Sequence, residues 1–309
     1  MADSPLPEAL RLTAEPTLRR PILIAGFQGW NDAGEAASSA VRFIHRRWRC
    51  EPLGDIDPEE FYDFTQIRPQ VRLERGERMV EWPANAFSAK RAEGLDRDII
   101  LLTGIEPHTA WRSYIDCIMA VCEKFQVEGA IILGALLGEV SHARPVRITG
   151  SASTDWLARP LGVSTQPRST YQGPIGIVGV MTQALRDKGI ATASLWANMP
   201  FYVQRTPNPK GSLALLERLN RGFGFGLNLH DLEVFAARFE AQVAGDLEEN
   251  AEVAEYARRV ASMADEEDDD EASDEPQTVE ELPDAASMVE DLERFLREQR
   301  GQQDQPGQP

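Results

Sequence analysis

Continuous runs of apolar residues mark the first half of the chain, and a segment with helical spacing follows each run. These runs cover residues 22–27, 98–105 and 129–137. Apolar side chains at consecutive positions are typical of strands that are covered on both faces. Strands that alternate with helices predict a parallel or mixed sheet between two layers of helices.

The helical segments show apolar residues three and four positions apart. After the first run, Ala37, Val41, Ile44 and Trp48 keep this spacing, which indicates a helix. Other expected elements are a helix from Thr109 to Phe125, helices near 153–161, 174–188 and 212–220, a strand at 192–198, and one long helix from 227 to about 263. Alternating segments at 60–67 and 71–82 suggest an antiparallel excursion, and 138–151 reads as a long irregular loop.

Composition divides the chain into a folded body and an acidic tail. The formal charge is −18, but residues 262–309 hold 17 acidic and 3 basic residues, which leaves about −4 for the body. We therefore expect five parts: a loose arm (1–20), a single domain (21–263), an acidic disordered linker (264–283), a short amphipathic helix (284–299) and a disordered tail (300–309). The short helix carries an apolar stripe for docking on the body or on another subunit, namely Met288, Leu292, Phe295 and Leu296.

The same features exclude several classes of protein. A body without a basic face is a poor partner for nucleic acid. The longest apolar run, 130–138, is much shorter than the roughly 20 residues of a membrane span, and the first residues lack a secretory signal. Three cysteines without Cys-x-x-Cys spacing fit a reducing cytoplasm and indicate no metal site. We expect a cytoplasmic protein without cofactor or metal.

A glycine-rich turn links the first predicted strand to its helix. Gly26, Gly29 and Gly34 flank a stretch in which backbone N–H groups could hold an anion at the helix start. Asp32 argues against a phosphate there, because its carboxylate already complements the helix dipole and would repel an anion. The spacing also differs from known dinucleotide and P-loop motifs, and no lysine follows. A structural turn and an anion site both remain open interpretations.

Polar residues follow three of the predicted buried strands. Asp32 follows the first, Glu106 and His108 the second, and Glu139 and His142 the third. Parallel strands would bring them together at the edge where such sheets bind ligands. The candidate ligand or interface crevice consists of Gly29, Asn31, Asp32, Glu106, His108, Glu139, His142 and Arg144.

The chemistry of this crevice has two interpretations. Carboxylates paired with histidines can perform acid–base catalysis or hold a metal ion. Carboxylates at strand ends also commonly cap helices, as Asp32 could do for the first helix and Glu106 for the second. Asn31 and Thr109 are further cap candidates for these two helices. No catalytic residue is assigned.

Several segments together resemble the proteasome assembly chaperone 2 family in its actinobacterial form. They are Gly-Phe-Gln-Gly-Trp-Asn-Asp-Ala-Gly at 26–34, Tyr-Asp-Phe-Thr-Gln-Ile-Arg-Pro at 62–69, Leu-Thr-Gly-Ile-Glu-Pro at 102–107, Gly-Glu-Val-Ser-His-Ala-Arg-Pro-Val-Arg at 138–147, Leu-Trp-Ala-Asn-Met-Pro at 195–200 and Pro-Asn-Pro-Lys-Gly at 207–211. The resemblance extends over residues 20–262 and is specific because many segments match in order.

The resemblance implies a three-layer α/β/α sandwich around a mixed sheet, similar to nucleoside phosphorylases and hydrolases, with added C-terminal helices. Relatives in eukaryotes and archaea are proteasome assembly factors. It thus implies a non-enzymatic, oligomeric scaffold or assembly chaperone that contacts other proteins, with proteasome subunits as partners and a trimer as the expected homo-oligomer. The alternative is a nucleoside phosphorylase- or hydrolase-like enzyme that uses the crevice at the carboxyl ends of the strands.

Overall fold

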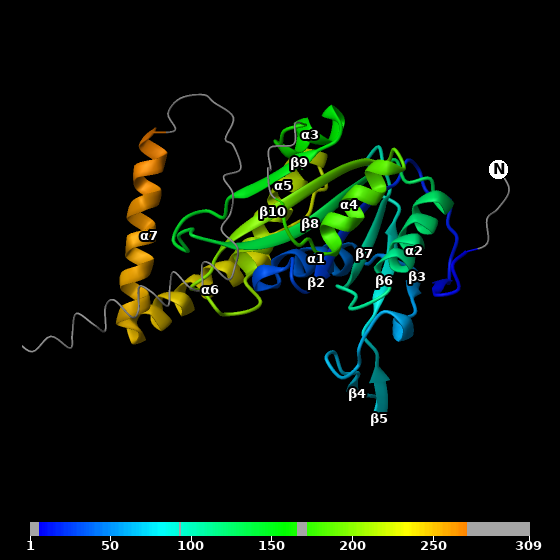
Figure 1. Ribbon diagram of the computed structural model, residues 1–309, viewed down its shortest axis with the longest axis horizontal. Coiled ribbons are helices and arrows are strands. Elements are labelled where there is room, and N and C mark those ends of the chain that lie inside the picture. Colours follow the sequence, from blue (N-terminus) through cyan, green and yellow to red (C-terminus); the bar gives the residue numbers. More distant parts are fainter. Residues whose placement is uncertain (1–5, 93, 166–171, 271–309) are drawn as a thin grey trace, which may run out of the picture.

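An eight-stranded mixed sheet forms the centre of the molecule in a computed structural model, which describes residues 6–92, 94–165 and 172–270 (Figure 1). The strands lie in the order β1-β3-β6-β7-β2-β8-β10-β9. Their bounds are β1 (Leu10–Leu12), β2 (Ile22–Gln28), β3 (Glu51–Ile56), β6 (Asn85–Lys90), β7 (Ile99–Ile105), β8 (Gly129–Gly138), β9 (Ile148–Ala152) and β10 (Ala191–Pro200).

Four parallel strands occupy the middle of this sheet. β2 pairs in parallel with β7 on one side and with β8 on the other, and β8 pairs in parallel with β10. β1, β3 and β6 extend the sheet in antiparallel fashion beyond β7, and β9 does so beyond β10. The four parallel strands therefore end at one edge, which we call the carboxyl edge.

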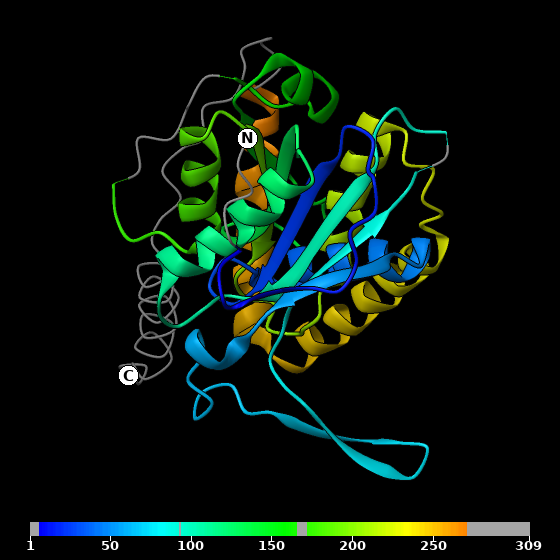
Figure 2. The ribbon, with the colours of Figure 1, turned by 90° about the vertical axis from the view of Figure 1, so that its right-hand side faces the viewer.

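Helices cover both faces of the sheet, as Figure 2 shows. One layer contains α1 (Ala36–Trp48), α3 (Asp155–Leu161) and α5 (Pro209–Phe223), and the other contains α2 (Trp111–Lys124) and α4 (Ile177–Asp187). Side chains of β2 alternate between the layers: Ile22 and Ile24 pack with α1, whereas Leu23 and Ala25 pack with α2. The predicted three-layer α/β/α sandwich is confirmed.

Gly26 in β2 allows the first helix to lie close to the sheet. A Cβ atom at this position would come within 2.8 Å of the carbonyl oxygen of Ala37 in α1. Any larger residue would push strand and helix apart, since real Cβ atoms do not approach backbone oxygen so closely. This first glycine of the turn therefore has a packing role.

A separate hairpin, β4 (Gln70–Glu74) and β5 (Glu77–Glu81), extends away from the body (Figures 1 and 2). The two strands pair only with each other among the described residues, and all ten residues are exposed. The antiparallel excursion predicted at 71–82 is therefore present, whereas 60–67 contain no strand.

The C-terminal part differs from the single long helix that the sequence predicted. It consists of α6 (His230–Glu249) and α7 (Ala251–Asp270), because Asn250 leaves the helical conformation with φ −129° and ψ 91°. α7 attaches to the body through a small apolar cluster of Tyr202, Tyr256, Ala257 and Val260.

Other expectations also need correction. Part of the arm at 1–20 is β1, which pairs with β3 instead of being loose. The irregular loop expected at 138–151 contains the start of β9, and the acidic segment begins inside α7, which continues to Asp270. The expected helix at 284–299, the tail at 300–309 and the docking residues Met288, Leu292, Phe295 and Leu296 lie outside the described residues.

Candidate functional site

The predicted crevice residues all follow strands that end at the carboxyl edge, but they separate into two groups. Gly29, Asn31, Asp32, Glu106 and His108 lie after β2 and β7. Glu139, His142 and Arg144 lie after β8, where they line a pocket. We describe the first group, then the pocket.

Asp32 is an internal cap for α1. Its side chain is 6% exposed, and Oδ1 accepts hydrogen bonds from the backbone N–H groups of Ala37 (2.7 Å) and Ser38 (3.2 Å). Oδ2 accepts a further bond from the Ser38 hydroxyl. Burial raises the pKa of Asp32 from its ordinary 3.8 to about 6, against the lowering effect of these bonds. The helix start is thus occupied by a carboxylate, which leaves an anion cradle there without support.

Glu106 joins two loops at the carboxyl edge. Its Oε2 accepts a hydrogen bond from the backbone N–H of Trp30 (3.1 Å), and its Oε1 accepts one from Ile177 at the start of α4 (2.7 Å). Gly29 has φ +134°, and a Cβ there would lie 2.8 Å from the Glu106 Cβ. Only glycine fits both the conformation and the space. Asn31 packs beside this carboxylate, because a Cβ on Gly176 would meet its Oδ1 and the Glu106 Oε1.

His108 holds a neighbouring loop rather than facing a ligand. The ring Nδ1 of His108 accepts a hydrogen bond from the backbone N–H of Asp63 (2.9 Å). The backbone N–H of His108 donates a hydrogen bond to the carbonyl oxygen of Phe61 (2.8 Å). Thr109, which we expected to cap α2, instead donates its hydroxyl proton to the carbonyl of Glu60, and Ala110 holds the cap position. Asp32, Glu106 and His108 therefore act as framework groups with backbone partners.

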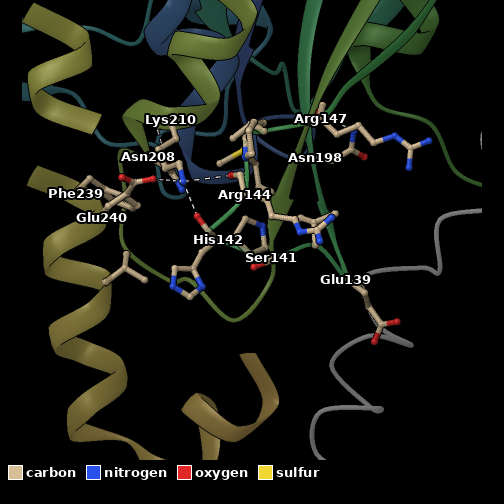
Figure 3. A pocket seen from close by; sticks show the side chains of 16 residues that line it. Glu139, Ser141, His142, Arg144, Arg147, Asn198, Asn208, Lys210, Phe239 and Glu240 are labelled. Carbon is tan, nitrogen blue, oxygen red and sulfur yellow. Dashed lines mark hydrogen bonds and ion pairs between the residues drawn. The ribbon is translucent and has the colours of Figure 1, made fainter. Parts of the chain in front are cut away.

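The pocket lies between the loop after β8, the end of β10, the start of α5 and one face of α6 (Figure 3). Its volume is about 340 Å³. Charged and polar side chains line it together with apolar ones: Glu139, Ser141, His142, Arg144, Arg147, Asn198, Asn208, Lys210 and Glu240 are polar, and Val140, Pro145, Val146, Met199, Pro200, Phe239 and Val243 are apolar.

Lys210 connects the walls of this pocket. Its ammonium group forms an ion pair with Glu240 of α6 and donates hydrogen bonds to the carbonyl oxygens of His142 and Arg144, as the dashed lines in Figure 3 show. The lysine side chain is only 13% exposed, whereas that of Glu240 is 50% exposed. One residue near the start of α5 therefore fixes both the loop after β8 and α6.

His142 and Tyr202 form a pair beside the pocket. The tyrosine hydroxyl lies 2.8 Å from Nδ1 of the histidine and also accepts a hydrogen bond from its backbone N–H (2.9 Å). Burial lowers the pKa of His142, and the nearby positive charge of Lys210 lowers it further. The imidazole is therefore neutral at physiological pH. Burial also raises the pKa of Tyr202, so its hydroxyl keeps its proton.

Glu139 links the pocket to the last described helix. Its Oε1 accepts a hydrogen bond from the hydroxyl of Tyr256 in α7 (2.7 Å). Tyr256 is fully buried and packs edge-on against Phe201 and Tyr202. The rim of the pocket and the attachment of α7 thus share residues.

The predicted crevice contains three residues of the pocket, Glu139, His142 and Arg144. Asn198, Asn208 and Lys210 stand in segments that carry the family resemblance, so that signal was available. No sequence signal pointed to Phe239 and Glu240, because a helix that is amphipathic along its length does not indicate which of its turns contacts a distant loop.

Among the described residues, no three His, Cys, Asp or Glu side chains are arranged to hold a metal ion. None of the helices placed by the structure has the length and apolar character needed to cross a bilayer.

Comparisons with known proteins show the family of this chain. A profile of the PAC2 family matches residues 26–245. The crystal structure of a PAC2 family protein from Streptomyces avermitilis shares 41% identity, with a TM-score of 0.68, over 76% of this chain and 99% of that one. A proteasome-assembly chaperone homologue from Mycobacterium tuberculosis shares 38% identity, with a TM-score of 0.67, over 76% and 99% of the two chains.

A more distant structure shares the fold alone. The archaeal proteasome activator PbaB from Pyrococcus furiosus has 16% identity and a TM-score of 0.62, over 76% of this chain and 97% of that one. Curated protein sequences yield no significant match. The profile spans more than half of the chain, and two close relatives are matched over nearly their whole length, so this protein is a member of the PAC2 family.

Proposed function

We propose that this protein is a non-enzymatic assembly chaperone that acts through contacts with other proteins, and that proteasome subunits are its partners. The observation that carries the proposal is its 38% identity, over nearly the whole length of the relative, to a proteasome-assembly chaperone homologue. The hydrogen bonds of Asp32 and Glu106 also support the proposal. These carboxylates were the candidates for acid–base work, and their oxygens accept hydrogen bonds from backbone N–H groups.

We further propose that the pocket after β8 is a contact site for the partner. The lining combines side chains of both charges, Arg144, Arg147 and Lys210 with Glu139 and Glu240, and apolar side chains that include Met199 and Phe239. Arginine and carboxylate side chains recognise each other through paired hydrogen bonds. The lining therefore suits a partner segment that presents charged side chains beside an apolar one.

The test is binding to unassembled proteasome subunits from the same organism. Purified chain is mixed with each subunit type and followed by sedimentation velocity, and the rate of proteasome formation is measured with and without it. We expect co-sedimentation with one subunit type and faster assembly. If the chain binds no subunit type and leaves the rate unchanged, the proposal is wrong.

A pair of variants tests the pocket itself. Arg144→Glu reverses the charge at the rim and should weaken subunit binding at least about tenfold, as expected for a contact worth more than 1 kcal/mol. Arg112→Glu, on α2 at the opposite layer, is the matched control and should bind as the unmodified chain does. Equal binding by both variants would exclude the pocket as the contact site.

A further inference from the structure

The pocket after β8 carries a net positive charge within a strongly acidic chain. Its lining contains three positive side chains and two negative ones, namely Arg144, Arg147, Lys210, Glu139 and Glu240 (Figure 3). Both carboxylates have partners in the same chain, because Glu240 pairs with Lys210 and Glu139 accepts a hydrogen bond from α7. The lining therefore attracts a further carboxylate, although the whole chain has a formal charge of −18.

Apolar side chains lie beside these charges. Met199 lines the pocket from the end of β10, and Phe239 and Val243 line it from successive turns of α6. Arginine binds carboxylates through paired hydrogen bonds, whereas apolar side chains bind apolar ones by excluding water. The pocket therefore suits a peptide in which carboxylates stand next to apolar side chains.

The chain itself contains a peptide of this composition. Residues 279–283 read Val-Glu-Glu-Leu-Pro, so two adjacent carboxylates are flanked by apolar side chains on both sides. We call these five residues the acidic segment; they lie outside the described residues. The surrounding residues 262–309 hold 17 acidic and 3 basic residues, so charge draws this part of the chain toward a positive site.

The acidic segment is long enough to reach the pocket of its own molecule. α7 is held to the pocket rim where the Tyr256 hydroxyl donates to Glu139 (2.7 Å), and this helix ends 14 residues later at Asp270. A helix rises 1.5 Å per residue, so its end lies about 21 Å along the axis from that contact. The residues from 271 to 280 span up to about 33 Å when extended. They can therefore bring Glu280 back to the pocket.

We infer that the acidic segment occupies the pocket after β8 of the same molecule and competes there with protein partners. The carboxylates of Glu280 and Glu281 approach the side of the pocket that bears Arg144 and Arg147, and the flanking apolar side chains contact the lining from α6. The inference rests on the proposed function in one respect, namely that a partner uses this pocket. Binding of the acidic segment itself does not depend on a partner.

A tethered segment needs only a weak affinity to keep its pocket occupied. A short linker holds its end at an effective concentration of about 1 mM. If the acidic segment has a dissociation constant of about 0.1 mM, it fills the pocket about nine-tenths of the time, and the apparent affinity of a competitor falls about tenfold. A partner that binds tightly still displaces it, so the contact moderates partner binding without preventing it.

The test is the binding of a synthetic peptide with the sequence of residues 276–287 to the full chain. The chain is immobilised at low density for surface plasmon resonance, so that copies cannot contact each other, and the peptide is supplied up to about 2 mM. A double variant, Glu280→Lys with Glu281→Lys, should bind the peptide about tenfold more tightly than the unmodified chain, because its own segment no longer competes. The matched control, Glu290→Lys with Asp291→Lys, makes the same change in charge and should bind as the unmodified chain does.

Further variants assign peptide binding to the pocket. Adding either Arg144→Glu or Arg147→Glu to the double variant at 280 and 281 should weaken peptide binding about tenfold or more, whereas adding Arg112→Glu on α2 should not change it. Circular dichroism verifies that each variant is folded, and either pocket variant suffices if the other does not fold. Equal binding by the unmodified chain and the double variant, no binding by the double variant, or binding that survives the pocket variants would each overturn the inference.

The outcome is separable from that of the proposed function, because the peptide experiment contains no proteasome subunit. Peptide binding as expected, by a chain that binds no subunit type, would refute the chaperone role alone. Subunit binding by a chain whose double variant does not bind the peptide would refute the contact of the acidic segment alone. If both hold, the double variant should bind the subunit about tenfold more tightly than the unmodified chain.

Discussion

The two groups of polar residues at the carboxyl edge use similar side chains in opposite ways. After β2 and β7, Asp32 and Glu106 accept hydrogen bonds from backbone N–H groups and fix the start of α1 and α4. After β8, Glu139 and His142 border a pocket of about 340 Å³ and bond to tyrosine side chains. A carboxylate at the carboxyl edge is therefore no indication of chemistry until its hydrogen-bond partners are known.

The largest effect should come from removing the buried cap. Asp32→Ala leaves two backbone N–H groups and the hydroxyl of Ser38 without their acceptor in a buried place. We expect a loss of about 3–4 kcal/mol in the free energy of unfolding, since each buried unsatisfied donor costs 1–3 kcal/mol. Urea unfolding measures it. A loss below about 1 kcal/mol would show that Asp32 does not stabilise the fold, and the distinction between framework residues and pocket residues would then be wrong.

The titration of Asp32 should make stability depend on pH. The folded chain keeps this proton up to about pH 6, whereas the unfolded chain releases it near pH 3.8. Between these values the folded chain binds more protons, so the free energy of unfolding falls as the pH rises. The full change is about 3 kcal/mol at most, from 1.36 kcal/mol per pKa unit.

Asp32→Asn isolates this effect, because asparagine retains an acceptor oxygen and does not titrate. Relative to Asp32→Asn, the unmodified chain should lose free energy of unfolding as the pH rises from about 4 to about 7. Above pH 7 the difference between the two should stay constant. A difference that stays constant over this range would show that Asp32 has an ordinary pKa.

A smaller loss should follow Glu106→Ala, which separates the loops at Trp30 and Ile177. Two charge-assisted hydrogen bonds disappear at a half-buried site, which gives about 2 kcal/mol. Hydrogen exchange should speed up at both amides together. Glu106→Gln, with one acceptor oxygen left, should lose less and free only one of the two amides; equal losses would contradict the bridging role.

The smallest effect on stability should come from the pocket. Lys210→Met keeps the apolar stem and removes the ion pair with Glu240 and the bonds to two carbonyl oxygens. We expect a loss of about 1 kcal/mol or less, because Glu240 is half exposed and returns to water. Subunit binding should fall by about tenfold or more. A variant that is strongly destabilised would place Lys210 with the framework.

The sequence predicted the centre of the fold and missed its margins. The buried strands β2, β7 and β8 carry an apolar residue at nearly every position, so their pattern is independent of context. Strands β3 and β9 contain proline or glycine and few apolar residues, and pairing with β6 and β10 holds them in the sheet. Such long-range pairing leaves no local periodicity to detect.

The site was predicted to a similar extent. Parallel strands explain why Glu106 and Glu139 share one edge, which spacing alone suggested. Spacing says nothing about which donors a carboxylate meets, because the amide of Ile177 reaches Glu106 from 71 positions away. Lys210 and His142, whose carbonyl oxygen accepts the lysine hydrogen bond, are separated by a similar 68 positions.

The place of β2 in the sheet also sets the order of events during synthesis. Ile22 pairs with Ile99 and with Gly129, which follow it by 77 and 107 positions. At roughly 5–20 residues per second, the ribosome needs about 5–20 s to supply β8 after β2 has been made. For that time β2, an apolar strand, has no partner on that side, so the nascent chain exposes a segment that is prone to aggregation.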